Sequence, residues 1–194
     1  MEKFITIESR AIPMPNENID TDQIIPARFL KATTRDGFGE NLFRDWRYDE
    51  NDHPKPDFIL NDKKYSGSIL IAGKNFGSGS SREHAAWALV DFGFKAVVSS
   101  FFADIFKSNA LNNGLLPVQV TDIFLSNLLD NVTKKPEELI RIDLGKQEVT
   151  LLSTGEKESF EINPYKKHCL QNGFDDIDYL VSILDKVSEF EKRK

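Results

Sequence analysis

The architecture of this chain follows from residues 68 to 86, which read Ser68-Ile69-Leu70-Ile71-Ala72-Gly73-Lys74-Asn75-Phe76-Gly77-Ser78-Gly79-Ser80-Ser81-Arg82-Glu83-His84-Ala85-Ala86. The apolar run at 69–72 predicts a buried strand, and the glycines after it predict a loop. We expect a helix over 81–92, because Ala85, Leu89 and Phe92 fall at i, i+4 and i+7. Gly93 is typical of the residue that ends a helix.

The next residues continue this alternation toward the C-terminus. Residues 96–99 read as a strand, 103–113 as a helix ended by Gly114, and 115–120 as another strand. Strand–helix–strand–helix–strand indicates a parallel α/β unit.

The flanking segments add other elements to this unit. We expect a strand over 4–12, a short helix near 123–129, an antiparallel hairpin from alternating residues at 140–144 and 149–151, and a third strand near 160–162. Two helices should follow, at 163–173 and 175–194, the second with one apolar stripe. The predicted fold class is therefore α/β: a single domain over 1–194, a parallel unit with antiparallel β additions, and a hairpin and helical extension from about 137.

Composition and charge limit the classes of partner. Hydrophobic residues make up 40% of the 194 residues and charged residues 29%, as in ordinary globular proteins. The net charge of -6 disfavours a phosphate backbone, so we expect no nucleic-acid partner. No apolar run approaches the roughly 20 residues of a membrane span, and residues 1–8 alternate like a strand rather than a signal sequence. A cytoplasmic location is the expectation.

Cysteine and histidine usage limits the metal chemistry. The chain has one cysteine, Cys169, so no internal disulfide can form and no cluster can be held by several thiolates of this chain. His53, His84 and His168 are far apart in sequence and lack metal-ligand spacing. We predict that this chain binds no metal.

The glycine-rich loop predicts an anion site. The backbone N–H groups of Gly77, Ser78 and Gly79, with the following helix N-terminus, are expected to face one anion. Arg82 adds a planar two-pronged donor for a carboxylate or phosphate. The alternative is structural, since Ser80 and Glu83 have the spacing of a helix capping box. For His84 we favour a structural role.

The string FGSGSSREHAA at 76–86 resembles the active-site loop of the swivelling β/β/α domain of the aconitase superfamily. Further resemblance lies in Asp20-Thr21-Asp22-Gln23-Ile24-Ile25-Pro26, in 102–106 and in 112–118. Within the superfamily the chain is most similar to small subunits of 3-isopropylmalate dehydratases, in Phe29-Leu30-Lys31, in the insert from Gly37 to Arg47, and in the tail from His168 to Ile177. The resemblance covers nearly the whole chain.

This resemblance implies a hydro-lyase activity that depends on a second chain. A heterodimer would convert 2-isopropylmalate to 3-isopropylmalate through isopropylmaleate, in leucine biosynthesis. The resemblance assigns a [4Fe-4S] cluster to the large subunit and no cofactor to this chain. By motif, Ser80 is the base that removes a C–H proton, while Ser81 and Arg82 bind the carboxylates of a small dicarboxylate.

Four more site residues are implied less directly. Arg35 is expected to be a second carboxylate clamp, although an apparent insertion changes its spacing, and it could instead be a solvated loop residue. Asp22 fits a carboxylate that orients a histidine of the partner, or one that caps a turn. Phe29 and Leu30 either contact the isopropyl group of the substrate or belong to the core.

The insert and the substrate leave further alternatives open. The apolar residues of the insert, Phe38, Leu42, Phe43 and Trp46, pack either on the partner or on this chain's own core. We expect 31–57 to be mobile in the isolated chain. Rival functions are the small subunit of a homoaconitate or methylmalate/citraconate-type hydro-lyase and, in another class, a stand-alone anion- or RNA-binding regulatory module.

Overall fold

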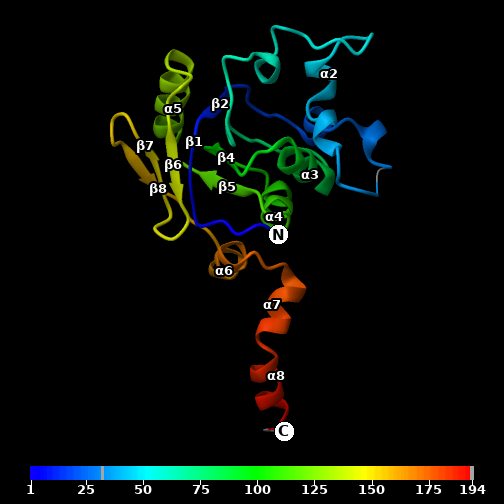
Figure 1. Cartoon of the computed structure of the whole chain (residues 1–194), viewed down its shortest axis with the longest axis vertical. Coiled ribbons are helices and arrows are strands. Elements are labelled where there is room, and N and C mark those ends of the chain that lie inside the picture. Colours follow the sequence, from blue (N-terminus) through cyan, green and yellow to red (C-terminus); the bar gives the residue numbers. More distant parts are fainter. Residues whose placement is uncertain (32, 193–194) are drawn as a thin grey trace.

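The computed structural model describes residues 1–31 and 33–192, and it contains two four-stranded sheets (Figure 1). The parallel sheet has the order β2 (Ala11–Met14), β3 (Ile69–Ala72), β4 (Ala96–Ser99) and β5 (Leu116–Gln119). The antiparallel sheet has the order β1 (Thr6–Ser9), β6 (Ile140–Asp143), β7 (Glu148–Leu151) and β8 (Lys157–Ser159). The predicted α/β class, with its parallel unit and antiparallel additions, is confirmed.

The helices connect and cover the strands. The longer ones are α3 (Glu83–Phe92), α4 (Asp104–Asn112), α5 (Asp122–Lys134), α6 (Pro164–Asn172), α7 (Asp176–Ser182) and α8 (Leu184–Glu191). The short ones are α1 (Thr21–Ile24), α2 (Arg44–Arg47) and the 3-10 turns η1 (Ala27–Phe29), η2 (Phe38–Asn41) and η3 (Ile59–Asn61). None of the helices within the described residues is long and apolar enough to cross a bilayer.

The first strand prediction was wrong in one respect. Residues 4–12 do not form one strand, because β1 and β2 are separated at Arg10 and join different sheets. β1 pairs antiparallel with β6, whereas β2 pairs parallel with β3. The backbone of Gly67 approaches this break so closely that a Cβ there would lie 1.9 Å from the carbonyl oxygen of Arg10. The single alternating pattern at 4–12 therefore contributes one strand to each of the two sheets.

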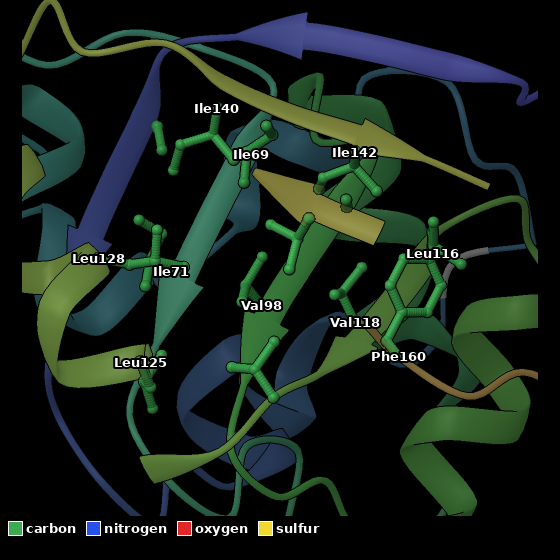
Figure 2. Packing of buried hydrophobic residues seen from close by; sticks show 14 of the residues in the cluster. Ile69, Ile71, Val98, Leu116, Val118, Leu125, Leu128, Ile140, Ile142 and Phe160 are labelled. Atoms are coloured by element: carbon green, nitrogen blue, oxygen red, sulfur yellow. The ribbon is translucent and has the colours of Figure 1, made fainter. Parts of the chain in front are cut away.

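Alternating residues of the buried strands supply two cores. Ile69 and Ile71 of β3 face the antiparallel sheet and α5, and Figure 2 shows them packed with Leu128 and Ile140. Leu70 of β3 belongs to the second core, on the other face, with residues of α3, α4 and the insert. A parallel strand covered on both faces needs a continuous apolar run, as 69–72 provides.

The insert packs on its own chain. Phe38, Leu42 and Phe43 are buried in the second core, and Trp46 stacks on Phe43 with ring centroids 5.6 Å apart. Of the two alternatives for these side chains, the structure therefore favours the chain's own core. Ala32, at the start of the segment that we expected to be mobile, lies outside the described residues.

The C-terminal extension differs from the single helix expected over 175–194. It forms α7 and α8, which meet at Ile183, where the backbone leaves helical geometry (φ -115°, ψ 15°). Asp176 fastens the start of α7 to α6 by accepting hydrogen bonds from Tyr165 (2.7 Å) and Lys166 (2.8 Å). Beyond this contact the two helices project away from the domain (Figure 1), and their apolar stripe is exposed.

Candidate functional site

Two loops meet at the carboxyl ends of β2 and β3, the edge of a parallel sheet where ligands bind. One loop leads from β2 into α1, and the other leads from β3 into α3. They are joined by backbone hydrogen bonds, from Gly77 N to Ile19 O (2.8 Å) and from Thr21 N to Ser78 O (2.8 Å). The segment at 20–26 and residues 76–82, which we call the serine–arginine loop, thus form one surface, joined by side-chain contacts between residues 57 to 60 apart in sequence.

The predicted anion loop is wrong for two of its three residues. The N–H groups of Gly77 and Ser78 both donate to the carbonyl of Ile19, so neither is available to an anion. Within residues 1–31 and 33–192, the N–H groups of Gly79, Ser80 and Ser81 have no hydrogen-bond partner. The open amides therefore lie at 79–81, closer to the first turn of α3 than the glycine pattern predicted.

The helix-capping alternative for Ser80 is also wrong. α3 begins at Glu83 with Arg82 as its N-cap residue, and no side chain caps it. The Glu83 carboxylate instead accepts a hydrogen bond from Asn113 Nδ2 (3.0 Å). Ser80 is held by its backbone, since its carbonyl accepts from Thr21 Oγ1 at 3.0 Å and from Arg82 N at 2.8 Å. Its exposed hydroxyl has no hydrogen bond to any described residue.

Arg82 and Asp22 form an ion pair across the two loops. The Arg82 side chain is only 16% exposed, whereas Asp22 is 57% exposed. Arg82 Nη1 also donates to the carbonyl of Ile25 at 3.5 Å. The turn-capping alternative for Asp22 is wrong, because Asp20 is the N-cap residue of α1 and forms a capping box with Gln23. Arg82 is therefore held in a mostly buried position, and the more exposed Asp22 is its ion-pair partner.

Arg35, two residues before the insert, reaches the first turn of α3. Its guanidinium lies 3.9 Å from Glu83 Oε1 and 4.9 Å from the centroid of the Trp87 ring. The backbone at Arg35 forms a turn over 35–38, closed by the hydrogen bond from Phe38 N to Arg35 O (3.0 Å). Since Glu83 directly follows Arg82, both predicted carboxylate clamps lie at the same helix end.

The remaining predicted site residues have mixed surroundings. Phe29 and Leu30 are half-buried and pack against the second core, and Arg28 lies over the Phe29 ring at 4.7 Å. Ser81 is exposed beside Ser80. His84 packs at 4.4 Å from the Trp87 ring and 5.7 Å from Phe38.

The candidate site is separate from the large cavity elsewhere in the described residues. A cavity of about 540 Å³ opens between α4 and α6, but it is lined by none of the predicted site residues. Within the described residues no group of three or more His, Cys, Asp or Glu side chains could hold a metal ion. The lone Cys169 is buried on α6.

Sequence reasoning missed the residues that hold the site together. Thr21 supports Ser80, Asn113 holds Glu83, and Trp87 contacts Arg35. Asn113 belongs to the segment 112–118 and Thr21 to 20–26, and both segments are part of the family resemblance. Membership of these segments was the one feature of the sequence that could have pointed to Asn113 and Thr21. The site thus combines the exposed Ser80, Arg35 and Asp22 with the mostly buried Arg82. These groups can bind carboxylates and move a proton.

Comparisons with known proteins find relatives over nearly the whole chain. The family model described as "Aconitase C-terminal domain" matches residues 1–131. A 3-isopropylmalate dehydratase small subunit from Christiangramia forsetii is 63% identical over 194 residues, covering 100% of this chain and 95% of that protein. One from Cytophaga hutchinsonii is 62% identical, covering 99% and 96%. The crystal structure of a 3-isopropylmalate dehydratase from Methanocaldococcus jannaschii superposes with a TM-score of 0.68 at 29% identity, covering 97% of this chain and 99% of that one.

Proposed function

This chain belongs to the family of 3-isopropylmalate dehydratase small subunits, and from that premise we propose that it supplies the proton-transfer half of a hydro-lyase active site. The reaction removes water from 2-isopropylmalate to give isopropylmaleate, and water is then added back to give 3-isopropylmalate, a step of leucine biosynthesis. The other half of the site comes from a large subunit in a heterodimer. The observation that carries this proposal is the cluster of the exposed Ser80 and Arg35 with the mostly buried Arg82 at one helix end.

Ser80 is the proposed base. Its alkoxide takes the proton from the carbon beside a substrate carboxylate and becomes the neutral hydroxyl, while the hydroxyl group on the neighbouring carbon leaves as water with a proton supplied by the large subunit's half of the site. A serine hydroxyl is a poor base unless its alkoxide is stabilised. The open N–H groups of 79–81 and the nearby positive charge of Arg82 support such an alkoxide. The proton taken by Ser80 returns to carbon when water is added back.

Arg82 and Ser81 bind a substrate carboxylate in this proposal. The carboxylate of Asp22 occupies the Arg82 guanidinium in the free chain. A substrate carboxylate would compete with Asp22, and Asp22 would then be available to orient a histidine of the large subunit. The exchange replaces one carboxylate partner of Arg82 with another.

Arg35 is the proposed clamp for the second carboxylate, and Phe29 and Leu30 are proposed to face the isopropyl group. The position of Arg35 over Trp87, beside Glu83, supports its role at the same helix end as Arg82. The half-burial of Phe29 and Leu30 supports an apolar contact that is already ordered before substrate arrives.

The proposed cofactor, a [4Fe-4S] cluster, belongs to the large subunit and would supply the Lewis acid that binds the departing hydroxyl. This chain does not fit a cluster site, because its single cysteine is buried on α6. A cytoplasmic location and a small dicarboxylate substrate, rather than nucleic acid, complete the proposal. The net charge of -6 argues against a nucleic-acid partner.

An anaerobic reconstitution with a substrate panel tests the proposal. The chain alone, a cluster-loaded large subunit alone and the mixture are each assayed with isopropylmalate, homoaconitate and methylmalate. We expect turnover only in the mixture, with isopropylmalate as the best substrate. Preference for homoaconitate or methylmalate would move the chain to a rival hydro-lyase, and turnover by the large subunit alone would remove the half-site proposal.

A further inference from the structure

Exposed apolar side chains lie near the serine–arginine loop, beyond the carboxyl ends of β4 and β5. Outside the C-terminal helices, the exposed large apolar residues among those described are Met1, Ile5, Phe101, Ile105, Ile123 and Leu139. Phe101 follows the end of β4, Ile105 lies in the first turn of α4, and Ile123 lies in the first turn of α5, after β5. Their exposed fractions are 46%, 51% and 77%. We call these three residues the apolar rim.

The sheet topology brings the apolar rim to the same edge as the candidate site. All four strands of the parallel sheet run in one direction, in the order β2, β3, β4, β5. Asp22 follows β2 and Ser80 follows β3, so the polar groups occupy one half of the carboxyl edge. The apolar rim follows β4 and β5 and occupies the other half.

Direct contacts join the two halves. Phe76 N, at the start of the serine–arginine loop, donates to Phe101 O at 3.2 Å. Lys74 pairs with Asp122, the residue before Ile123, at 3.8 Å. Gly77 lies so close to α4 that a Cβ there would be 2.2 Å from Phe106 Cγ, and Phe106 is the neighbour of Ile105. The apolar rim is therefore continuous with the loop that carries Ser80.

From this arrangement we infer that the apolar rim is part of the docking surface for the large subunit, an inference that rests on the proposed function. A partner that completes the site must cover Ser80. A standard interface buries about 800 Å² on each side, which corresponds to a disc with a radius of roughly 16 Å. Adjacent strands are only about 4.8 Å apart, so β5 lies well inside such a disc centred on the loop after β3.

The chemistry of the apolar rim fits a protein partner. Aromatic and large aliphatic side chains beside polar catalytic groups are typical of interface anchors, since their burial excludes water from the neighbouring polar contacts. Phe101 is the strongest anchor candidate, because aromatic residues are enriched at interface centres. At this edge of the sheet, the polar half thus carries the reacting groups, and the apolar half contacts the large subunit.

Affinity measurements with matched controls test this inference. Phe101→Ser, Ile105→Ser and Ile123→Ser are compared with Leu180→Ser and Leu184→Ser, whose side chains are 53% and 55% exposed on α7 and α8. The dissociation constant of the full chain for the large subunit is measured by biolayer interferometry without substrate, and thermal melting checks the fold of each variant. We expect Phe101→Ser and Ile105→Ser to raise the dissociation constant for the large subunit by about tenfold or more. The controls should stay within about twofold of wild type.

The outcomes separate this inference from the proposed function. Unchanged affinity in all three rim variants, with a wild-type complex that forms and turns over, would overturn the docking surface and leave the proposed function intact. Equal losses in the control variants would overturn it too. A wild-type chain that forms no complex would overturn the proposed function and the docking surface together. At saturating large subunit the rim variants should regain wild-type turnover, because they do not touch the reacting groups.

Discussion

Gly77→Ala should destabilise the chain far more than a typical surface substitution. Gly77 has a φ of +78°, in the left-handed region, and it lies against the side chain of Phe106 on α4. A Cβ at this position would lie 2.2 Å from Phe106 Cγ and 2.5 Å from Phe106 Cβ. Phe106 is buried in the second core against Phe76 and Phe102, so its ring has little room to move.

Two effects set the size of the loss. The left-handed conformation of a non-glycine residue costs about 1–2 kcal/mol. Forcing an extra methyl group into a packed core costs about 1–3 kcal/mol more. Together they lower the free energy of unfolding by roughly 2–5 kcal/mol. At about 2–4 °C per kcal/mol for a chain of this size, the melting temperature should fall by roughly 4–20 °C.

Gly155→Ala is the matched control, since Gly155 also has a positive φ, +73°, but a Cβ there meets nothing within 4 Å. Only the backbone effect applies, so its loss should be about 1–2 kcal/mol. Chemical denaturation of the wild type and both variants measures the difference. Equal losses for the two variants would refute the idea that the serine–arginine loop is fixed by its packing on Phe106.

Three further predictions concern the ion pairs. Arg82→Lys should lower kcat/KM of the reconstituted enzyme roughly tenfold to a hundredfold, since one charge-assisted hydrogen bond is worth about 1.5–3 kcal/mol; unchanged kinetics would contradict the clamp. In a double-mutant cycle on unfolding, Arg35→Ala and Glu83→Gln should couple by no more than about 1 kcal/mol, because both side chains are exposed; a larger coupling would contradict this. The hydrogen bond from Arg28 lowers the pKa of Asp45, so the stability contributed by this pair is present above the unfolded pKa of about 3.9 and is lost as pH falls through the lowered folded pKa. Asp45→Asn should therefore destabilise slightly at pH 7 and by less at pH 3, as urea denaturation at both values would show.

The parallel unit could be predicted because its elements are local and strongly patterned. Residues 69–72 and 96–99 are apolar runs that can only be buried, and Gly93 and Asn113-Gly114 mark the helix ends. The division at Arg10 could not be predicted, because both β1 and β2 read as one alternation and their separation depends on partners more than 50 residues away. The break at Ile183 has no signal in the apolar stripe, which continues through it.

The candidate site was predictable as a set of residues but not as a geometry. Ser80, Arg82 and Glu83 stand together in one motif, yet the capping box that their spacing predicts does not form, because Asn113 takes the Glu83 carboxylate. The pairing of Arg82 with Asp22 joins two loops that no local pattern connects. Both the absent capping box and the Arg82–Asp22 pair depend on hydrogen bonds between residues far apart in sequence, and such bonds produce no periodic pattern from which they could be predicted.

The reconstituted turnover of Ser80→Ala tests the central claim most directly. The variant is mixed anaerobically with the cluster-loaded large subunit and assayed with isopropylmalate, beside Ser108→Ala, which alters an exposed serine on α4 that has no part in the proposed chemistry. We predict that Ser80→Ala binds the large subunit and melts like wild type but loses at least about a hundredfold in kcat, as expected for a lost general base, while Ser108→Ala keeps full activity. Wild-type turnover in a folded, assembled Ser80→Ala complex would contradict the account.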